Sequence, residues 1–356
     1  MLIATSTLGL EGAVARELKA LGYTIKDSSN GKILFESSIK DVPFLNIHLR
    51  TPERLLLFLG SFVATSYDEL YENIRNLDFS ALPKQAKVWI EKVRCVDSKL
   101  FSERAVQSVA MKAFADSLKA VDGSQLCPIH IYLRKNRAIV ALDMTGKYGL
   151  HMRGYRKKYS KAPLRETIAA ALLILSRYEK EGCLHDPFCG SGTIAIEAAM
   201  IASNIPPGLN RDFSSQTWKI LMDLYEKERE RAKAAIKTKK VKIFCSDIDE
   251  KILKVARENA RRAGVFFDIF REDFRRVKPS CETGKIVTNP PYGKRMESIW
   301  KHFPKLFETF ASWEVHTITP YSNLKSPFHK KIKSIPFFNS GVKVFFNQFL
   351  PKTFSR

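Results

Sequence analysis

The segment from residue 183 to residue 202 constrains the fold of this chain more than any other. It begins with a short apolar run, Cys183 to Asp186, that is typical of a buried strand, and it ends with an unbroken apolar helical pattern, Ile194 to Ala202. A turn with two glycines, Gly190 and Gly192, connects them. Glycine lets the backbone approach a ligand that a Cβ atom would block, and the helix amino terminus faces that ligand. The segment therefore predicts the nucleotide-binding unit of an open α/β sheet.

Strand and helix patterns alternate after this segment. Strands are expected at 241–246, 265–270, 285–288 and 315–319, helices at 250–263 and 297–310, and a closing hairpin around 339–341. This alternation predicts a doubly wound, mostly parallel sheet with an antiparallel finish. Residues 1–150 mix strands and helices in a different order, with a strong hairpin signal at Asn30-Gly31. They predict a smaller α+β region.

Side chains suited to an adenosine compound follow the strands of the predicted sheet. The carboxyl ends of parallel strands meet at one edge, where open α/β sheets bind ligands. Asp247, after the second strand, can accept hydrogen bonds from both ribose hydroxyls. Asp273, after the third strand, can accept one from an adenine amino group while Phe274 packs on the ring. The predicted cofactor site comprises Asp186, Phe188, Gly190, Gly192, Asp247, Ile248, Asp273 and Phe274.

The glycine turn also fits the loose fingerprint of nicotinamide dinucleotide enzymes. That pattern expects an acidic residue about 20 residues further on, within a compact unit. Asp247 lies 57 residues after Gly190, and a charged insertion separates the two. The spacing therefore disfavours a nicotinamide enzyme.

The tetrapeptide Asn289-Pro290-Pro291-Tyr292 follows the fourth strand and supplies the predicted catalytic residues. The exocyclic amine of a base is a weak nucleophile, because its lone pair is delocalised into the ring. The Asn289 side-chain oxygen and the Pro290 carbonyl can accept its hydrogens and stabilise the positive charge that develops on nitrogen. The prolines stiffen the backbone, and Tyr292 can stack on the flat base. With the adenosine site, the tetrapeptide predicts methyl transfer from S-adenosylmethionine to an amine, with no separate general base required.

The balance of charge predicts a polyanionic partner. Lys and Arg outnumber Asp and Glu by 59 to 37, which gives a net charge of +22. Solubility alone is a weaker explanation, since acidic surfaces serve it at least as well. Basic residues and tyrosines interleave between 153 and 159, where a solvated linker is the alternative interpretation. The residues predicted to contact RNA there are Arg153, Arg156, Lys157 and Lys158.

The six cysteines predict neither a metal site nor a disulfide framework. They are scattered, and no two form a Cys-x-x-Cys pair, which disfavours a zinc ribbon and an iron–sulfur cluster. We expect no bound metal, free thiols that pack as small apolar groups, and a reducing cytoplasmic compartment. The amino terminus lacks the regions of a signal peptide, and no apolar run reaches transmembrane length, so we expect no membrane partner.

The chain resembles the THUMP-domain RNA guanine-N2 methyltransferases, whose members include bacterial 23S rRNA enzymes and a tRNA relative. The matching segments are 9–11 and 21–23 near the amino terminus, 150–156 and 162–167 between domains, the cofactor motif 186–193, and the insertion 206–213 followed by Trp218. The resemblance covers nearly the whole chain. It implies that S-adenosylmethionine is the cofactor and RNA the partner.

The resemblance also implies a domain organisation. Residues 1–55 would form a ferredoxin-like region, 56–150 a THUMP RNA-binding module, and 151–356 a Rossmann-like class I methyltransferase domain. Arg165 and Thr167 would border the cofactor. The implied activity is methylation of guanine N2 in 23S rRNA. The sequence shows no second methyltransferase domain, which some rRNA members carry, so a tRNA substrate stays open.

Three other functions share parts of this pattern. A protein glutamine-N5 methyltransferase uses the same Asn-Pro-Pro-Tyr motif to bind the amine that it methylates, but it does not need the basic α+β half. A DNA or RNA adenine-N6 methyltransferase is a further alternative, because it also methylates an exocyclic amine. A non-catalytic RNA-binding module would tolerate loss of the acids and of Asn289, all of which are present.

Overall fold

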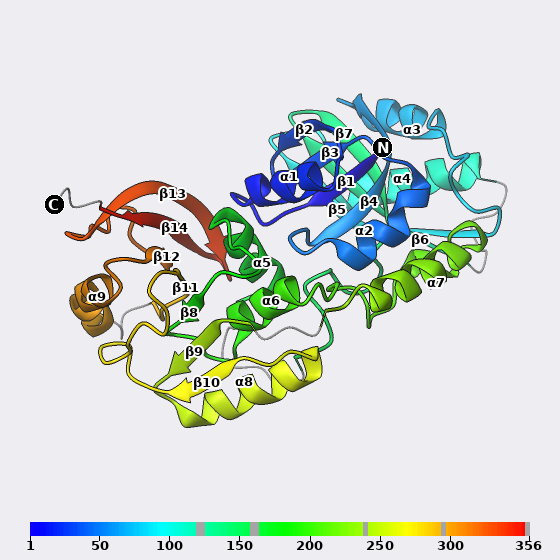
Figure 1. The fold of residues 1–356 in the computed structure, drawn as a ribbon. Coiled ribbons are helices and arrows are strands. Elements are labelled where there is room, and N and C mark those ends of the chain that lie inside the picture. Colours follow the sequence, from blue (N-terminus) through cyan, green and yellow to red (C-terminus); the bar gives the residue numbers. More distant parts are fainter. Residues whose placement is uncertain (119–124, 157–163, 238–240, 293–296, 353–356) are drawn as a thin grey trace.

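The chain forms two lobes, each built around a seven-stranded sheet (Figure 1). The computed structural model describes residues 1–118, 125–156, 164–237, 241–292 and 297–352. The first sheet belongs to the amino-terminal lobe. The second belongs to the carboxy-terminal lobe and carries the glycine turn.

The amino-terminal sheet has the strand order β2-β3-β1-β4-β7-β6-β5. Its strands are β1 (Leu2–Thr5), β2 (Ile25–Ser29), β3 (Lys32–Phe35), β4 (Arg54–Val63), β5 (Ala86–Val96), β6 (Gln125–Arg134) and β7 (Arg137–Asp143). Only the β5–β6 pair is parallel. The helices are α1 (Glu11–Ala20), α2 (Val42–His48), α3 (Tyr67–Arg75) and α4 (Glu103–Ser117), with a short 3-10 turn, η1 (Ile39–Asp41). Buried side chains of the four α-helices share one core with one face of the sheet.

The carboxy-terminal sheet has the order β10-β9-β8-β11-β12-β14-β13. Its strands are β8 (Leu184–Asp186), β9 (Ile243–Asp247), β10 (Asp268–Arg271), β11 (Lys285–Thr288), β12 (Glu314–Thr319), β13 (His329–Asn339) and β14 (Val342–Pro351). The helices are α5 (Glu166–Leu175), α6 (Thr193–Ala202), α7 (Lys219–Ala234), α8 (Glu250–Ala263) and α9 (Glu297–Thr309), with a 3-10 turn, η2 (Ser214–Thr217). The first five strands in this order run parallel, and β14 is antiparallel to both of its neighbours, β12 and β13.

The strand order fixes where a ligand can bind. The chain passes from β8 to β9 and β10 on one side, and then returns to β11 and β12 on the other. In open α/β sheets the crevice at such a reversal, outside the carboxyl ends of the strands, is the ligand site. The predicted fold class, a Rossmann-like methyltransferase sheet preceded by an α+β region, is confirmed.

Local turn chemistry explains several element boundaries. Asn30 and Gly31 have φ values of 50° and 73°, and they join β2 to β3 as the sequence predicted. Helix α8 begins after Asp249, whose side chain accepts a hydrogen bond from the Lys251 backbone N–H at 2.8 Å. It ends at Gly264 with φ of 70°, a left-handed conformation that favours glycine.

Helix α7 crosses from one lobe to the other. It follows β8 in sequence, yet Trp218, Leu221 and Tyr225 are buried in the core of the amino-terminal lobe. The Asn46 side-chain amide of α2 donates a hydrogen bond to the Tyr225 hydroxyl at 2.6 Å. Figure 1 shows α7 lying beside α2, away from the second sheet. A domain boundary near residue 150 therefore does not separate the two cores, because residues after 150 pack in the core of the amino-terminal lobe.

The amino-terminal lobe is likewise one sheet. Strand β1 pairs with β4, and β4 pairs with β7. The expected boundary at residue 55 falls within β4, so the ferredoxin-like segment and the segment after it share backbone hydrogen bonds.

The expectation of free thiols is wrong for two of the six cysteines. Cys183 and Cys281, 98 residues apart in sequence, form a disulfide. They meet because Cys183 precedes β8 and Cys281 lies before β11, and these two strands are neighbours. The other four cysteines are free.

Candidate active site

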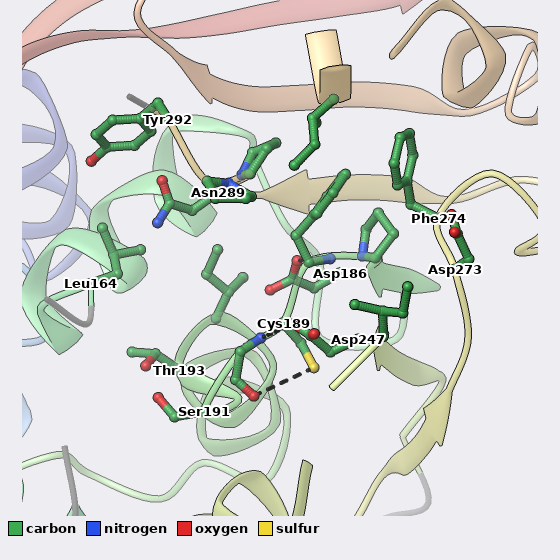
Figure 2. A pocket seen from close by; sticks show the side chains of 18 of the residues that line it. Leu164, Asp186, Cys189, Ser191, Thr193, Asp247, Asp273, Phe274, Asn289 and Tyr292 are labelled. Atoms are coloured by element: carbon green, nitrogen blue, oxygen red, sulfur yellow. Dashed lines mark hydrogen bonds between the residues drawn. The ribbon is translucent and has the colours of Figure 1, made fainter. Parts of the chain in front are cut away.

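A cavity of about 780 Å³ opens at the carboxyl ends of β8, β9, β10 and β11. Figure 2 shows Asn289 and Tyr292 on one side of it, Asp247, Asp273 and Phe274 on the other, and Asp186 between them. The sheet thus brings together residues that are far apart in sequence. This is the edge at which the sequence predicted a ligand site.

The two glycines of the turn have different roles. Gly190 lines the cavity with φ of 52°, and a Cβ atom added there would meet no atom within 4 Å. Gly192 has φ of 82° and is the N-cap of α6; an added Cβ would lie 3.2 Å from the Ala256 Cβ on α8. Gly190 therefore leaves space for a ligand, while Gly192 permits close packing of two helices.

Asp186 is a buried acid at the centre of the cavity. Its Oδ1 accepts hydrogen bonds from the Thr288 hydroxyl at 2.6 Å and from the Phe188 backbone N–H at 3.2 Å. Burial raises the pKa of Asp186 to about 7, helped by the nearby charge of Asp247 and opposed by the two hydrogen bonds. A cationic ligand group at this point would favour the ionised carboxylate.

Asp247 is held in place by backbone groups. Gly190 N–H donates to one carboxylate oxygen at 3.0 Å, and Asp249 N–H donates to the other at 3.1 Å. Each oxygen keeps a second acceptor position, so the carboxylate can still bind a pair of hydroxyls. Ile248 beside it is exposed at the edge of the cavity.

Asp273 and Phe274 line the cavity at the end of β10. The Asp273 carboxylate pairs with the Arg275 side chain and accepts the Arg275 backbone N–H at 2.9 Å. The Arg275 hydrogen bonds lower the pKa of Asp273, so it is ionised at neutral pH. The ring centres of Phe274 and Phe188 lie 4.7 Å apart, which gives the cavity an aromatic wall.

The Asn289 side-chain oxygen is buried at the cavity and has no hydrogen-bond partner among the described residues. A buried acceptor without a partner is costly, typically about 1–3 kcal/mol, so it marks a position for a ligand donor. Pro290 and Pro291 continue the lining from this point. Tyr292 is fixed by the Asn339 side-chain amide, which donates to its hydroxyl at 2.5 Å.

Arg165 and Thr167, which were expected to border the cofactor, are not among the residues that line this cavity. Both contact Glu53 of the amino-terminal lobe: the Thr167 hydroxyl donates to it at 2.6 Å, and the Arg165 guanidinium lies 3.4 Å away. Burial opposes ionisation of Glu53, but hydrogen bonds with His151 and Thr167 and the Arg165 charge outweigh it and lower its pKa to about 2. These residues join the lobes.

The structure pairs Arg153 and Arg156, which were predicted to contact RNA, with carboxylates of the protein. The Arg153 side chain is buried and lies 3.4 Å from Glu197. Arg156 is buried too, 3.6 Å from Glu166, and it donates to the Leu164 carbonyl at 3.0 Å and to the Thr193 hydroxyl at 2.7 Å. Neither guanidinium is free for a phosphate, because carboxylates at the lobe junction occupy them. Lys157 and Lys158 lie outside the described residues.

Sequence reasoning missed several residues that line the cavity. They come from the start of α5, from α6, from α9 and from the β13–β14 turn: Leu164, Thr193, Ile299, His302, Asn339 and Ser340. The Asn339-Ser340-Gly341 turn was recognisable as a turn, but no local signal placed it beside Asn289. Its position depends on the antiparallel return of β13 along β14.

The described residues lack two other kinds of site. They contain no group of three or more His, Cys, Asp or Glu side chains placed to hold a metal ion. No helix among them has the length and apolar character needed to cross a membrane.

The fold and the cavity define a class I methyltransferase, and comparisons with known proteins identify the family. Residues 153–333 match the family described as "RMKL-like, methyltransferase domain", and residues 1–56 match the "RlmL ferredoxin-like domain". The chain therefore belongs to the RMKL-like methyltransferases. Its cofactor is S-adenosylmethionine, and the three acids and the glycine turn at the cavity suit such a compound.

Individual relatives agree with this assignment. The chain is 37% identical to YpsC of Bacillus subtilis, provisionally named an RNA methyltransferase, over 99% of this chain and 96% of YpsC. It is 31% identical to the Legionella pneumophila ribosomal RNA large subunit methyltransferase K/L, over 87% of this chain but only 47% of that longer protein.

Solved structures also match over almost the whole chain. A possible methylase from Clostridium difficile 630 is 36% identical, with a TM-score of 0.90 over 100% of this chain and 99% of that one. SMU.472, solved in complex with SAH (S-adenosylhomocysteine), is 29% identical, with a TM-score of 0.85 over 99% and 98% of the two chains.

Proposed function

We propose that this protein transfers a methyl group from S-adenosylmethionine to an exocyclic amine of a base in RNA. The first candidate is the N2 amine of a guanine in 23S rRNA. The observation that carries the proposal is the buried, unpaired Asn289 oxygen in a cavity that also holds the cofactor acids. Because this oxygen has no donor within the described residues, it can accept a hydrogen bond from the N–H of a substrate amine.

The cofactor residues would orient the reaction from one side. Asp186 would hold the ammonium group of the methionine part, since it is a buried carboxyl that ends β8 directly before the glycine turn. Asp247 would accept the two ribose hydroxyls. Phe188 and Phe274 form the aromatic wall against which the adenine ring can pack.

The tetrapeptide would act on the substrate from the other side. Asn289 and the Pro290 carbonyl accept the two amine hydrogens, which turns the nitrogen lone pair toward the methyl carbon. Bound S-adenosylmethionine would supply the sulfonium methyl group, which would pass to the amine nitrogen with S-adenosylhomocysteine as the leaving group. The amine proton then passes to solvent. Tyr292, fixed by Asn339, would stack on the base. Positioning and preorganised acceptors supply the catalysis.

RNA is the substrate class that the rest of the molecule favours. The net charge of +22 fits a polyanion. The relatives named above include a ribosomal RNA large subunit methyltransferase. We assign residues 56–150 to a THUMP-type RNA-binding role on the basis of the sequence resemblance. A tRNA guanine or an adenine N6 amine would use the same acceptors, so the target base rests on that resemblance.

Mass spectrometry of modified nucleosides tests the proposal directly. Deletion of the gene should remove one N2-methylguanosine signal from large-subunit rRNA, and the wild-type gene should restore it. The Asn289→Ala gene should not restore it. Loss of a tRNA nucleoside, or of N6-methyladenosine, would replace the proposed target. An unchanged nucleoside profile in both RNA classes would contradict an RNA substrate.

A further inference from the structure

The amino-terminal sheet has an outer face that its helices do not cover. Ile3, Leu56 and Ala141 are buried on this face, and the apolar neighbours that pack on them within the described residues come from strands, Tyr132 among them. The opposite face carries the helical core. A sheet face left without helices is available for a partner.

A second cavity, of about 710 Å³, lies along this face and the lobe junction. Its lining holds six Lys or Arg side chains and one carboxylate, Glu53. The cationic residues are Lys32, Arg54, Lys92, Arg94, Arg134 and Arg165. The register places Lys92 opposite His130, Arg94 opposite Tyr132, and Val96 opposite Arg134, so the cations follow the β5–β6 edge.

The protein neutralises only part of this charge. Glu53 already contacts His151, Thr167 and Arg165. Arg54 is paired with Asp143, and Arg94 lies 3.5 Å from Glu103. Lys32, Lys92 and Arg134 have no ion pair among the described residues. Burial lowers the pKa of Lys32, and the charges of Lys92 and Arg134 lower it further. Like charges that crowd one cavity in this way favour a bound anion.

The Tyr132 ring contacts two lysine side chains at the cavity. The Lys32 ammonium lies 4.1 Å from the centre of the Tyr132 ring, and the Lys92 ammonium lies 5.8 Å from it. The Tyr132 hydroxyl is 3.1 Å from His130 Nδ1, which fixes the ring. Cation–π contacts thus hold two ammonium groups on one aromatic platform.

This cavity adjoins the active cavity along the chain. Leu164 lines the active cavity and Arg165 lines the second one, so consecutive residues, about 3.8 Å apart at Cα, separate the two. The two cavities are also connected through Gly9. It follows Leu8, which lines the second cavity, and it packs closely on β13: a Cβ atom added at Gly9 would lie 2.1 Å from the Pro336 carbonyl oxygen. Strand β13 ends at Asn339 in the active cavity.

We propose that the phosphates of a single-stranded RNA segment next to the target base bind in this second cavity, on Lys32, Lys92, Arg134 and Arg165. This inference rests on the proposed function and names the RNA path to its site. The target base then enters the active cavity beside Leu164. The buried junction residues Arg153 and Arg156 hold the two cavities in register and do not contact RNA.

The test is Lys92→Gln combined with Arg134→Gln in the full chain. Both side chains are exposed, so the fold should be kept, as a thermal melt will check. The probe is a fluorescein-labelled single-stranded RNA oligonucleotide of mixed sequence, titrated at several salt concentrations. Each lost phosphate contact should reduce the slope of log affinity against log salt by about 0.7, so the double variant should lose about 1.4. Its affinity for S-adenosylhomocysteine should not change.

The matched control is Lys227→Gln combined with Lys254→Gln, which removes two exposed charges from α7 and α8, outside both cavities. It should keep the wild-type slope. An unchanged slope in the cavity variant, or equal losses in both variants, would overturn the inference.

The same proteins separate this inference from the proposed function. If wild-type protein binds RNA with the steep slope but transfers no methyl to it, the proposed function fails while the RNA path stands. If wild-type protein methylates RNA and the cavity variant does so with unchanged KM, the RNA path fails while the proposed function stands.

Discussion

Asp186 is a residue of the active cavity whose ionisation is suppressed by burial. Its pKa lies at about 7 in the folded protein against an ordinary value of 3.8, and burial is the main cause. The folded state therefore binds this proton more tightly than the unfolded state. In the free protein, stability from this group is present below about pH 4 and declines as pH rises toward 7.

Asp186→Asn should separate stability from binding. The amide oxygen can still accept from Thr288, and the buried charge is gone. We expect the variant to melt at a higher temperature than wild type at pH 8 without cofactor, and to show a weaker fall in stability between pH 4 and 7. Its affinity for S-adenosylhomocysteine should drop, by calorimetry, because charge-assisted hydrogen bonds contribute about 1.5–3 kcal/mol. A lower melting temperature together with unchanged affinity would contradict this role of Asp186.

Arg156 and Arg165 form a contrasting pair. Arg156 is buried against Glu166 and two residues of the active cavity, whereas Arg165 is exposed. Arg156→Gln should destabilise the fold by about 3–5 kcal/mol, because it leaves Glu166 buried without its partner. The salt slope of RNA binding should stay the same. Arg165→Gln should make the salt slope of RNA binding shallower and leave folding stability nearly at the wild-type value. Denaturant titration measures the stability, and RNA titration at several salt concentrations measures the slope.

At the scale of elements, the strand–turn–helix unit of β8 and α6 was predictable in detail. Its residues are contiguous in the sequence. The two glycines predict a tight turn from local sequence alone, without knowledge of tertiary contacts. The sequence could not distinguish the two glycines, however. That distinction depends on Ala256 of α8, which packs against Gly192 and leaves Gly190 facing the cavity.

The glycines should therefore fail in different ways. Gly190→Ala should cost about 1–2 kcal/mol for its left-handed backbone and also weaken cofactor binding, because the new methyl enters the cavity. Gly192→Ala should lose more stability, since its methyl also meets Ala256 at 3.2 Å. Thermal melts and calorimetry with S-adenosylhomocysteine measure the two effects. Equal loss of stability in both variants would show that backbone strain alone causes the loss, with no contribution from the contact with Ala256.

At the scale of the whole molecule, the parts that sequence reasoning missed are those made by packing between lobes. Residues 153–156 looked like an RNA-contacting segment because charge and tyrosine cluster there. The structure buries the Arg153 and Arg156 side chains against Glu197 and Glu166, which belong to helices α6 and α5. Helix α7 lies in the charged insertion between Gly190 and Asp247, and Tyr225 anchors it in the other lobe. Such partners cannot be read from a local pattern.

The strand-end residues were predictable for the opposite reason. Parallel strands place their carboxyl ends at one edge, so Asp186, Asp247, Asp273 and Asn289 had to converge once the strands were recognised. The structure adds that the Asn289 oxygen is buried without a partner, which no sequence pattern shows.

The measurement that tests this account most directly is single-turnover methyl transfer from labelled S-adenosylmethionine into large-subunit rRNA, by wild-type protein and by Asn289→Ala, with cofactor affinity measured in parallel. The account predicts transfer by wild type, a rate about 10²–10³ lower in the variant, and equal affinity of both for S-adenosylhomocysteine, because Asn289 acts on the charge that develops in the transition state. Transfer by Asn289→Ala at the wild-type rate would contradict it.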